Sequence, residues 1–99
     1  MYIREIDLIN DVKAKLNTPD KRSYELFVSE RNFPRAGEYV ATIVLRVLPE
    51  TNIEALSKEL MKLFIQGEEV KLVRSYLTII PEKQLRTVDF ELQAIICLE

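Results

Sequence analysis

Apolar residues recur at helical spacing in two segments of the chain, and each recurrence predicts an amphipathic helix. Around residues 3–16, charged side chains lie opposite a broad apolar arc formed by Tyr2, Ile6, Leu8, Ile9, Val12 and Leu16. In residues 53–64, the apolar stripe is formed by Ile53, Leu56, Leu60, Leu63 and Phe64, with Met61 interpreted as a further core side chain. Each helix is therefore expected to bury one face and to leave the other in water.

Local signals predict where these two helices begin and end. Pro19 cannot continue a helix and disfavours helical backbone at the residue before it, so the first helix is expected to stop just before it. Thr51 and Glu54 have the spacing of a capping box, in which each side chain satisfies a free backbone donor near the other residue. Gly67 is well placed to stop the second helix.

Alternation of apolar and polar residues predicts four strands, at residues 22–30, 39–48, 70–80 and 87–98. The third strand changes parity midway, which indicates either a β-bulge near Arg74 or a strand with both faces partly buried. Residues 31–38 and 81–85 contain turn-forming residues and are expected to be loops. The last strand alternates most clearly: Val88, Phe90, Leu92, Ala94, Ile96 and Leu98 are expected inside, and Asp89, Glu91 and Gln93 outside.

The predicted element order is αββαββ, in two half-repeats of about residues 3–48 and 52–98 within a single domain of residues 1–99. Each helix must lay its apolar stripe on a sheet. We therefore expect an α+β, ferredoxin-like two-layer sandwich in permuted αββαββ order, with a four-stranded antiparallel sheet and both helices on one face.

The second face of this sheet is expected to hold more apolar side chains than a solvated surface needs. From strand phase we expect five residues to point away from the helices and to form a candidate interaction surface: Phe27, Val40, Val44, Leu48 and Ile95. Cys97 has the same phase. Such a surface is either covered or used for association, and the long edge strands offer a second route to a partner. An ordinary sheet with scattered exposed valines is an equally open interpretation.

Composition removes several classes of function. The net charge of −2 and the pI of about 5.3 argue against nucleic-acid binding, which rests on clustered Lys and Arg. The chain has no His and a single Cys, and it contains no known catalytic, phosphate-binding or metal-ligating motif. We therefore expect neither an enzyme nor a cofactor or metal site, and we interpret Cys97 as a small apolar residue at a strand end.

No apolar run approaches the roughly 18 residues of a membrane span, so we expect this segment itself to make no membrane contact.

The order of predicted elements resembles the periplasmic domain of the PilO family. In that family a strand leads into an amphipathic helix and then a strand hairpin, and here these places are taken by residues 39–48, 53–64, 70–80 and 88–98. PilO is an inner-membrane assembly protein of type IV pili. The pattern is similar also to the M and L proteins of type II secretion.

This resemblance consists of element order and hydrophobic phase, and it covers nearly all of the chain. It implies a non-enzymatic scaffold that pairs with itself or with a similar-fold protein, as a homodimer or heterodimer. It implies the periplasmic face of the inner membrane if a transmembrane segment lies upstream, and otherwise the cytoplasm. The transmembrane helix and coiled coil that normally precede such a domain are missing from this sequence.

The alternative is a cytoplasmic ferredoxin-like module that regulates another protein or senses a small ligand. A sensor of this kind typically has a glycine-bearing loop at a strand–helix junction, where ligand approaches backbone amides. The junction at residues 49–52 reads Pro-Glu-Thr-Asn and contains no glycine. The sequence therefore favours the association module.

Overall fold

The computed structural model describes residues 4–18, 20 and 24–97. Two helices and four long strands form the main body: α1 (Glu5–Lys15), β1 (Tyr24–Arg35), β2 (Glu38–Val47), α2 (Ile53–Met61), β5 (Lys71–Ile80) and β6 (Leu85–Cys97). Two short strands, β3 (Phe64–Ile65) and β4 (Glu68–Glu69), pair with each other between α2 and β5. A single 3-10 turn, η1 (Pro81–Lys83), joins β5 to β6.

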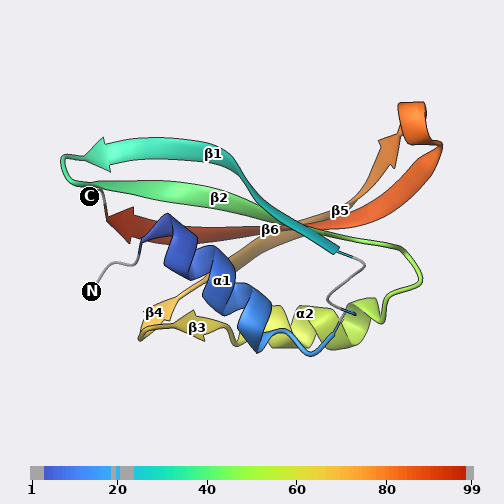
Figure 1. The fold of residues 1–99 in the computed structure, drawn as a ribbon, viewed down its shortest axis with the longest axis horizontal. Helices are drawn as coiled ribbons and strands as arrows, with labels where there is room; N and C mark the ends of the chain where they lie inside the picture. The colour runs from blue at the N-terminus through green and yellow to red at the C-terminus, as the bar shows by residue number, and fades with distance from the viewer. Residues whose placement is uncertain (1–3, 19, 21–23, 98–99) are drawn as a thin grey trace.

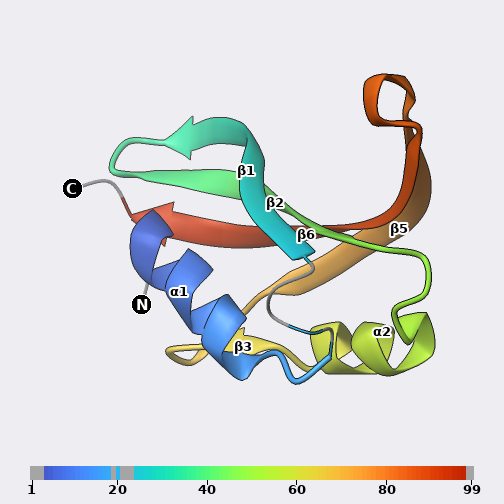
Figure 2. The ribbon, with the colours of Figure 1, turned by 45° about the vertical axis from the view of Figure 1, so that its right-hand side comes forward.

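The four long strands form one sheet in the order β1-β2-β6-β5, with every neighbouring pair antiparallel. Both helices lie on the same face of this sheet, and no helix of the described residues covers the opposite face, the helix-free face (Figure 1). The predicted α+β class, with a four-stranded antiparallel sheet and two helices, is confirmed. The sheet is strongly twisted, and the hairpin of β5 and β6 rises away from the helical layer (Figure 2).

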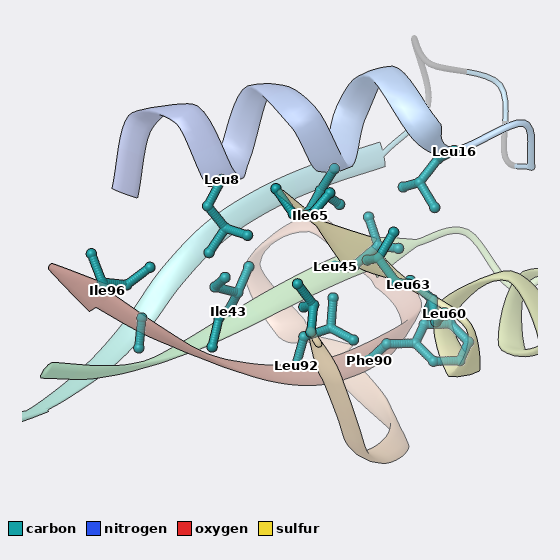
Figure 3. Packing of buried hydrophobic residues seen from close by; sticks show 14 of the residues in the cluster. Leu8, Leu16, Ile43, Leu45, Leu60, Leu63, Ile65, Phe90, Leu92 and Ile96 are labelled. Atoms are coloured by element: carbon teal, nitrogen blue, oxygen red, sulfur yellow. The ribbon is translucent and has the colours of Figure 1, made fainter. Parts of the chain in front are cut away.

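The hydrophobic core fills the space between the helices and the sheet. Leu8 of α1 and Leu16, which directly follows the helix, point toward Ile43 and Leu45 of β2, and Ile65 of β3 lies between α1 and the sheet (Figure 3). Each of these five side chains is at most 1% exposed. The inward residues of β6, from Phe90 to Ile96 in alternation, continue the same layer, as their sequence phase predicts.

The apolar arc predicted for α1 is too wide. Leu8, Val12 and Leu16 are buried and Ile9 is half-buried, but Ile6 is 66% exposed. At about 100° per residue, Ile6 lies on the far side of the helix from the stripe that begins at Leu8. Tyr2, which was assigned to the same arc, lies outside the described residues.

The N-terminus of α2 differs from the prediction. The capping residue is Asn52, whose side-chain oxygen accepts a hydrogen bond of 3.1 Å from the backbone N–H of Ala55. The predicted capping box of Thr51 and Glu54 is therefore wrong by one position. Asn, Ser, Thr and Asp are all good N-caps, so adjacent Thr51 and Asn52 offered two candidates that sequence could not separate.

The C-terminus of α2 is also earlier than predicted. The helix ends at Met61, and the β3–β4 hairpin follows, so Met61 and Phe64 are 69% and 53% exposed and do not join the core. Gly67 does not stop the helix. It follows Gln66 at the tip of the hairpin, where both residues have positive φ, at 81° and 52° respectively, as in a two-residue hairpin turn.

Strand β1 is longer than predicted, because it continues through Arg35 into residues that were assigned to a loop. The pairing of β1 with β2 is irregular between Val28 and Glu30 and again between Asn32 and Arg35. Each irregularity shifts the register, so the alternation disappears from the sequence while the strand persists. In β5, the first of the two alternatives for the parity change near Arg74 is the one observed, since the β5–β6 register shifts between Leu72 and Arg74.

The extension of β1 anchors α1 to the sheet. The Arg31 guanidinium donates hydrogen bonds of 3.0 and 2.6 Å to the two carboxylate oxygens of Glu5, and the Tyr39 hydroxyl donates to the same carboxylate. The Arg31 hydrogen bonds lower the pKa of Glu5 from its ordinary value, although partial burial opposes this shift. A segment that was expected to be a loop therefore holds the first turn of the helix in place.

Candidate interaction surface on the helix-free face and the β5 edge

The middle of the helix-free face is occupied by an ion pair between β2 and β6. Arg46 and Asp89 are cross-strand partners, and the Arg46 guanidinium donates hydrogen bonds of 3.1 and 3.0 Å to the Asp89 carboxylate. The hydroxyls of Thr78 and Thr87 donate to the same carboxylate, at 2.8 and 3.1 Å. Asp89 was expected to point outward into water, but it is only 1% exposed, because these partners surround it.

The environment of Asp89 keeps it ionised. Burial alone raises the pKa of a carboxyl group. Here the hydrogen bonds from Arg46, Thr78 and Thr87 outweigh the burial and hold the pKa of the Asp89 carboxyl below its usual value. The group is therefore a fixed structural charge, and a proton-transfer role at neutral pH is not favoured.

A second ion pair joins β6 to β5 on the same face. The Arg74 guanidinium donates hydrogen bonds of 2.8 and 3.0 Å to the Glu91 carboxylate, and the Tyr76 hydroxyl donates to it at 3.2 Å. The hydrogen bonds from Arg74 lower the pKa of Glu91. The Arg74 guanidinium also lies 5.1 Å from the centroid of the Tyr76 ring, within cation–π range.

Val44 is not available as an exposed contact, contrary to expectation. It lies on the helix-free face between its cross-strand partners Phe27 and Glu91, yet it is only 3% exposed. Arg46 lies over the Phe27 ring at 5.2 Å, which leaves Phe27 half-buried. Long charged side chains cover apolar neighbours with their aliphatic stems, so this part of the face is closed within the chain itself.

The other residues of the predicted surface are more open but are dispersed. Val40 and Ile95 are cross-strand partners toward the far end of β2 and β6, where Val40 is half-buried and Ile95 is 43% exposed. Leu48 follows β2 and is half-buried, and Cys97 at the end of β6 is also half-buried. The five predicted residues therefore do not form one continuous exposed patch.

Exposed apolar side chains gather instead on β5. Among the described residues, nine large apolar side chains are exposed, and four of them, Val73, Tyr76, Leu77 and Ile79, belong to this strand. β5 is also an edge of the sheet, because β6 is its neighbour on one side and the order of strands ends there. The strand therefore presents apolar side chains beside backbone groups that no described strand pairs with.

The opposite edge of the sheet is protected. β1 contains Pro34, the two register shifts described above, and the charged residues Glu25, Glu30, Arg31 and Arg35. Proline, bulges and charges are the features that prevent an edge strand from accepting another strand. In β5, by contrast, residues 75–80 read Ser-Tyr-Leu-Thr-Ile-Ile and contain no charge and no proline.

Two of the hollows on the described part of the surface lie near Leu48. One of about 440 Å³ lies between the connections that follow α1 and β2, and one of about 280 Å³ lies beside Arg46 and Ile80; Leu48 lines both. Within the described residues, no group of three or more His, Cys, Asp and Glu side chains is arranged to hold a metal ion. Neither described helix has the length and apolar character that a membrane crossing requires.

The sequence predicts long edge strands but does not indicate which edge of the sheet is unprotected. The missed signal is the uncharged run of residues 75–80, within the strand expected at residues 70–80. The pairs of Arg46 with Asp89 and of Arg74 with Glu91 were also missed, because they depend on the strand register. Comparison of the chain with protein-family models, with curated proteins and with solved structures found no match.

Proposed function

We propose that this domain is a non-enzymatic module for protein–protein association, which pairs with itself or with a domain of similar fold. The observation that supports this proposal best is the concentration of exposed apolar side chains on an edge strand. Leu77 and Ile79 are 58% and 63% exposed, and Val73 and Tyr76 are 44% and 37% exposed. The register puts Tyr76 on the helix-free face and Leu77 and Ile79 on the other face, so exposed apolar side chains flank the free edge of β5 on both sides. Exposed apolar surface of this kind is typical of an interaction site.

The fold is compatible with a ferredoxin-like domain in permuted order. Moving the first strand of a ferredoxin-like sheet to the end of the chain produces the neighbour relationships β1-β2-β6-β5 that this sheet has. The β3–β4 hairpin is an addition to that pattern. On this basis we propose that the domain is a scaffold of the kind found in the PilO family and in the M and L proteins of type II secretion.

The proposed location follows from that assignment. An assembly scaffold of this kind would lie at the periplasmic face of the inner membrane, held by a transmembrane segment upstream of Met1. The residues encoded upstream of Met1 test this part of the proposal. A short basic segment followed by an apolar span would support it, and a native start at Met1 without such a span would leave the cytoplasmic location.

Association itself is tested by sedimentation of the purified domain over a wide range of concentration. The domain is measured alone and after mixing with domains of similar fold that are encoded by adjacent genes. We expect a dimer of modest affinity in at least one of these mixtures. Monomeric behaviour at the highest concentration in every one of them would contradict the proposed function.

A further inference from the structure

The β5 edge can be assigned a specific occupant. We propose that β5 pairs with β5 of a second copy of this chain, in antiparallel direction, so that the two four-stranded sheets form one continuous sheet. This inference rests on the proposed function and names the strand and the partner. Edge-to-edge addition uses main-chain hydrogen bonds for affinity, and the neighbouring side chains then set register and specificity.

The distribution of charge along β5 favours a second copy in antiparallel direction. Lys71 and Arg74 are the charged residues of β5, and both lie in its first half. Parallel pairing in register would place each of them directly opposite its own copy, which is destabilising. Antiparallel pairing about Tyr76 places Arg74 opposite Thr78 of the second copy.

This arrangement separates the like charges. The two Arg74 residues are then offset by four positions along the strands, which corresponds to roughly 13–14 Å. That offset exceeds the screening length of about 8 Å at physiological ionic strength. Arg74 also remains paired with Glu91 of its own chain, which reduces the remaining repulsion.

The side chains of β5 are complementary to themselves in the same register. Pairing about Tyr76 places Leu77 opposite Ser75 of the second copy, and Ile79 next to Val73, which lies at the register shift where the regular part of β5 begins. Tyr76 meets its own copy on the two-fold axis, where two aromatic rings can stack across the strands. Each exposed apolar side chain of β5 therefore gains an apolar, aromatic or small neighbour, and no charged residue is placed opposite one of like charge.

The other surfaces of the domain fit a second copy less well. The β1 edge is interrupted by Pro34 and by two register shifts, so it cannot offer a regular row of donors and acceptors. The middle of the helix-free face is filled by the Arg46–Asp89 and Arg74–Glu91 pairs, whose hydrogen bonds are made within the chain. The uncharged, regular part of β5 is therefore the favoured edge.

The proposal is tested with two matched lysine substitutions on the two edges of the sheet. Leu77→Lys changes β5 and Phe33→Lys changes β1, and both residues are largely exposed, at 58% and 63%, so neither substitution buries a charge in the monomer. The apparent mass of the wild-type domain and of each variant is measured by sedimentation equilibrium over the same concentrations. Circular dichroism of each variant checks that it is folded.

We expect the wild type to dimerise with rising concentration, Leu77→Lys to weaken the dimer by about tenfold or more, and Phe33→Lys to leave it unchanged. A wild-type dimer that both variants retain, or that both weaken equally, overturns the β5 assignment while leaving the proposed association intact. If the wild-type domain stays monomeric when measured without a partner, a second copy does not occupy the β5 edge. The mixtures with similar-fold domains then decide the proposed function separately.

Amide hydrogen exchange of the wild type gives an independent readout that needs no substitution. In the proposed dimer, alternate backbone amides of β5 gain hydrogen bonds to the second copy. We expect their exchange to slow as protein concentration rises, with no change in β1. Slowing that occurs in β1, on the helices or nowhere would overturn the proposal even if Leu77→Lys failed to fold.

Discussion

Arg46 on β2 and Asp89 on β6 are joined by two hydrogen bonds across the helix-free face, at 3.1 and 3.0 Å. The Asp89 side chain is 2% exposed, whereas the Arg46 side chain is 26% exposed, so a buried carboxylate is matched by a cation that reaches solvent. This asymmetry distinguishes the pair from a surface salt bridge. It also makes several properties of the domain predictable.

Replacing Asp89 with Ala should be strongly destabilising. The substitution leaves Arg46 without its main partner and removes the acceptor of the Thr78 and Thr87 hydroxyls. Breaking a buried ion pair in this way costs about 3–5 kcal/mol, and because Arg46 can turn to solvent we expect about 2–4 kcal/mol. Urea unfolding followed by circular dichroism measures the change in the free energy of unfolding.

Glu91→Ala is the matched control for that substitution. Glu91 accepts two hydrogen bonds from Arg74 on the same face, but the Arg74 side chain is 66% exposed. Water can replace most of this interaction, so the urea midpoint should move by less than half as much as in Asp89→Ala. Equal shifts in the two variants would mean that the burial of Asp89 has no special importance.

The stability of the domain should fall in acid through Asp89. Its folded-state pKa is lowered, so its contribution is fully present above the unfolded-state value of about 3.9 and is lost as the pH falls through the folded pKa. Asp89→Asn lacks this titration. We therefore expect the free energy of unfolding of wild type to decrease more than that of Asp89→Asn between neutral pH and pH of about 3. A parallel decrease in both proteins would assign the acid sensitivity to other carboxylates, such as Glu5.

Val44→Glu should destabilise the fold, although Val44 lies on the helix-free face. Val44 is 3% exposed, so the new carboxylate would be buried without a partner, and we expect a loss of roughly 3 kcal/mol or more. Ile95→Glu is the control on the same face, because Ile95 is 43% exposed. Thermal unfolding followed by circular dichroism compares the two, and a folded, wild-type-like Val44→Glu would show that the face opens easily.

Asn52→Ala should weaken the start of α2. The Asn52 side chain accepts from the Ala55 backbone N–H at 3.1 Å, and loss of an N-cap of this type costs about 0.5–2 kcal/mol. Thr51→Ala tests the neighbouring residue and should cost less than about 0.5 kcal/mol. If Thr51→Ala were the more damaging variant in urea unfolding, the capping box predicted from sequence would be the better description.

Much of the fold could be predicted from local pattern. The stripe of Leu8, Val12 and Leu16, the alternation from Val88 to Ile96 and the parity change near Arg74 each identified an element and its buried face. These features follow from helical and strand periodicity alone. Element ends were less predictable, because the extension of β1 and the end of α2 at Met61 depend on pairing with distant strands or on a following hairpin.

The candidate site could not be predicted as a whole from the sequence. Phase alone assigned Val44 and Asp89 to the helix-free face, and the register confirms that assignment. Phase cannot report exposure, and both side chains are buried by neighbours on adjacent strands. Arg46, which covers Asp89, lies 43 positions away from it in the chain. The exposure of Leu77 and Ile79 likewise became visible only when β5 was placed at the edge of the sheet.

The sequence by itself determined the α+β class, the apolar stripes that form the core and the absence of catalytic motifs, because these depend on residue type and local period. Tertiary structure alone decided which strand became an unprotected edge and which charges found partners, because both depend on the order and register of strands that are distant in sequence. Every residue type except proline offers the same backbone donor and acceptor to a neighbouring strand. Strand order is therefore set by how the whole apolar surface packs, and the surface available to a partner follows from that packing.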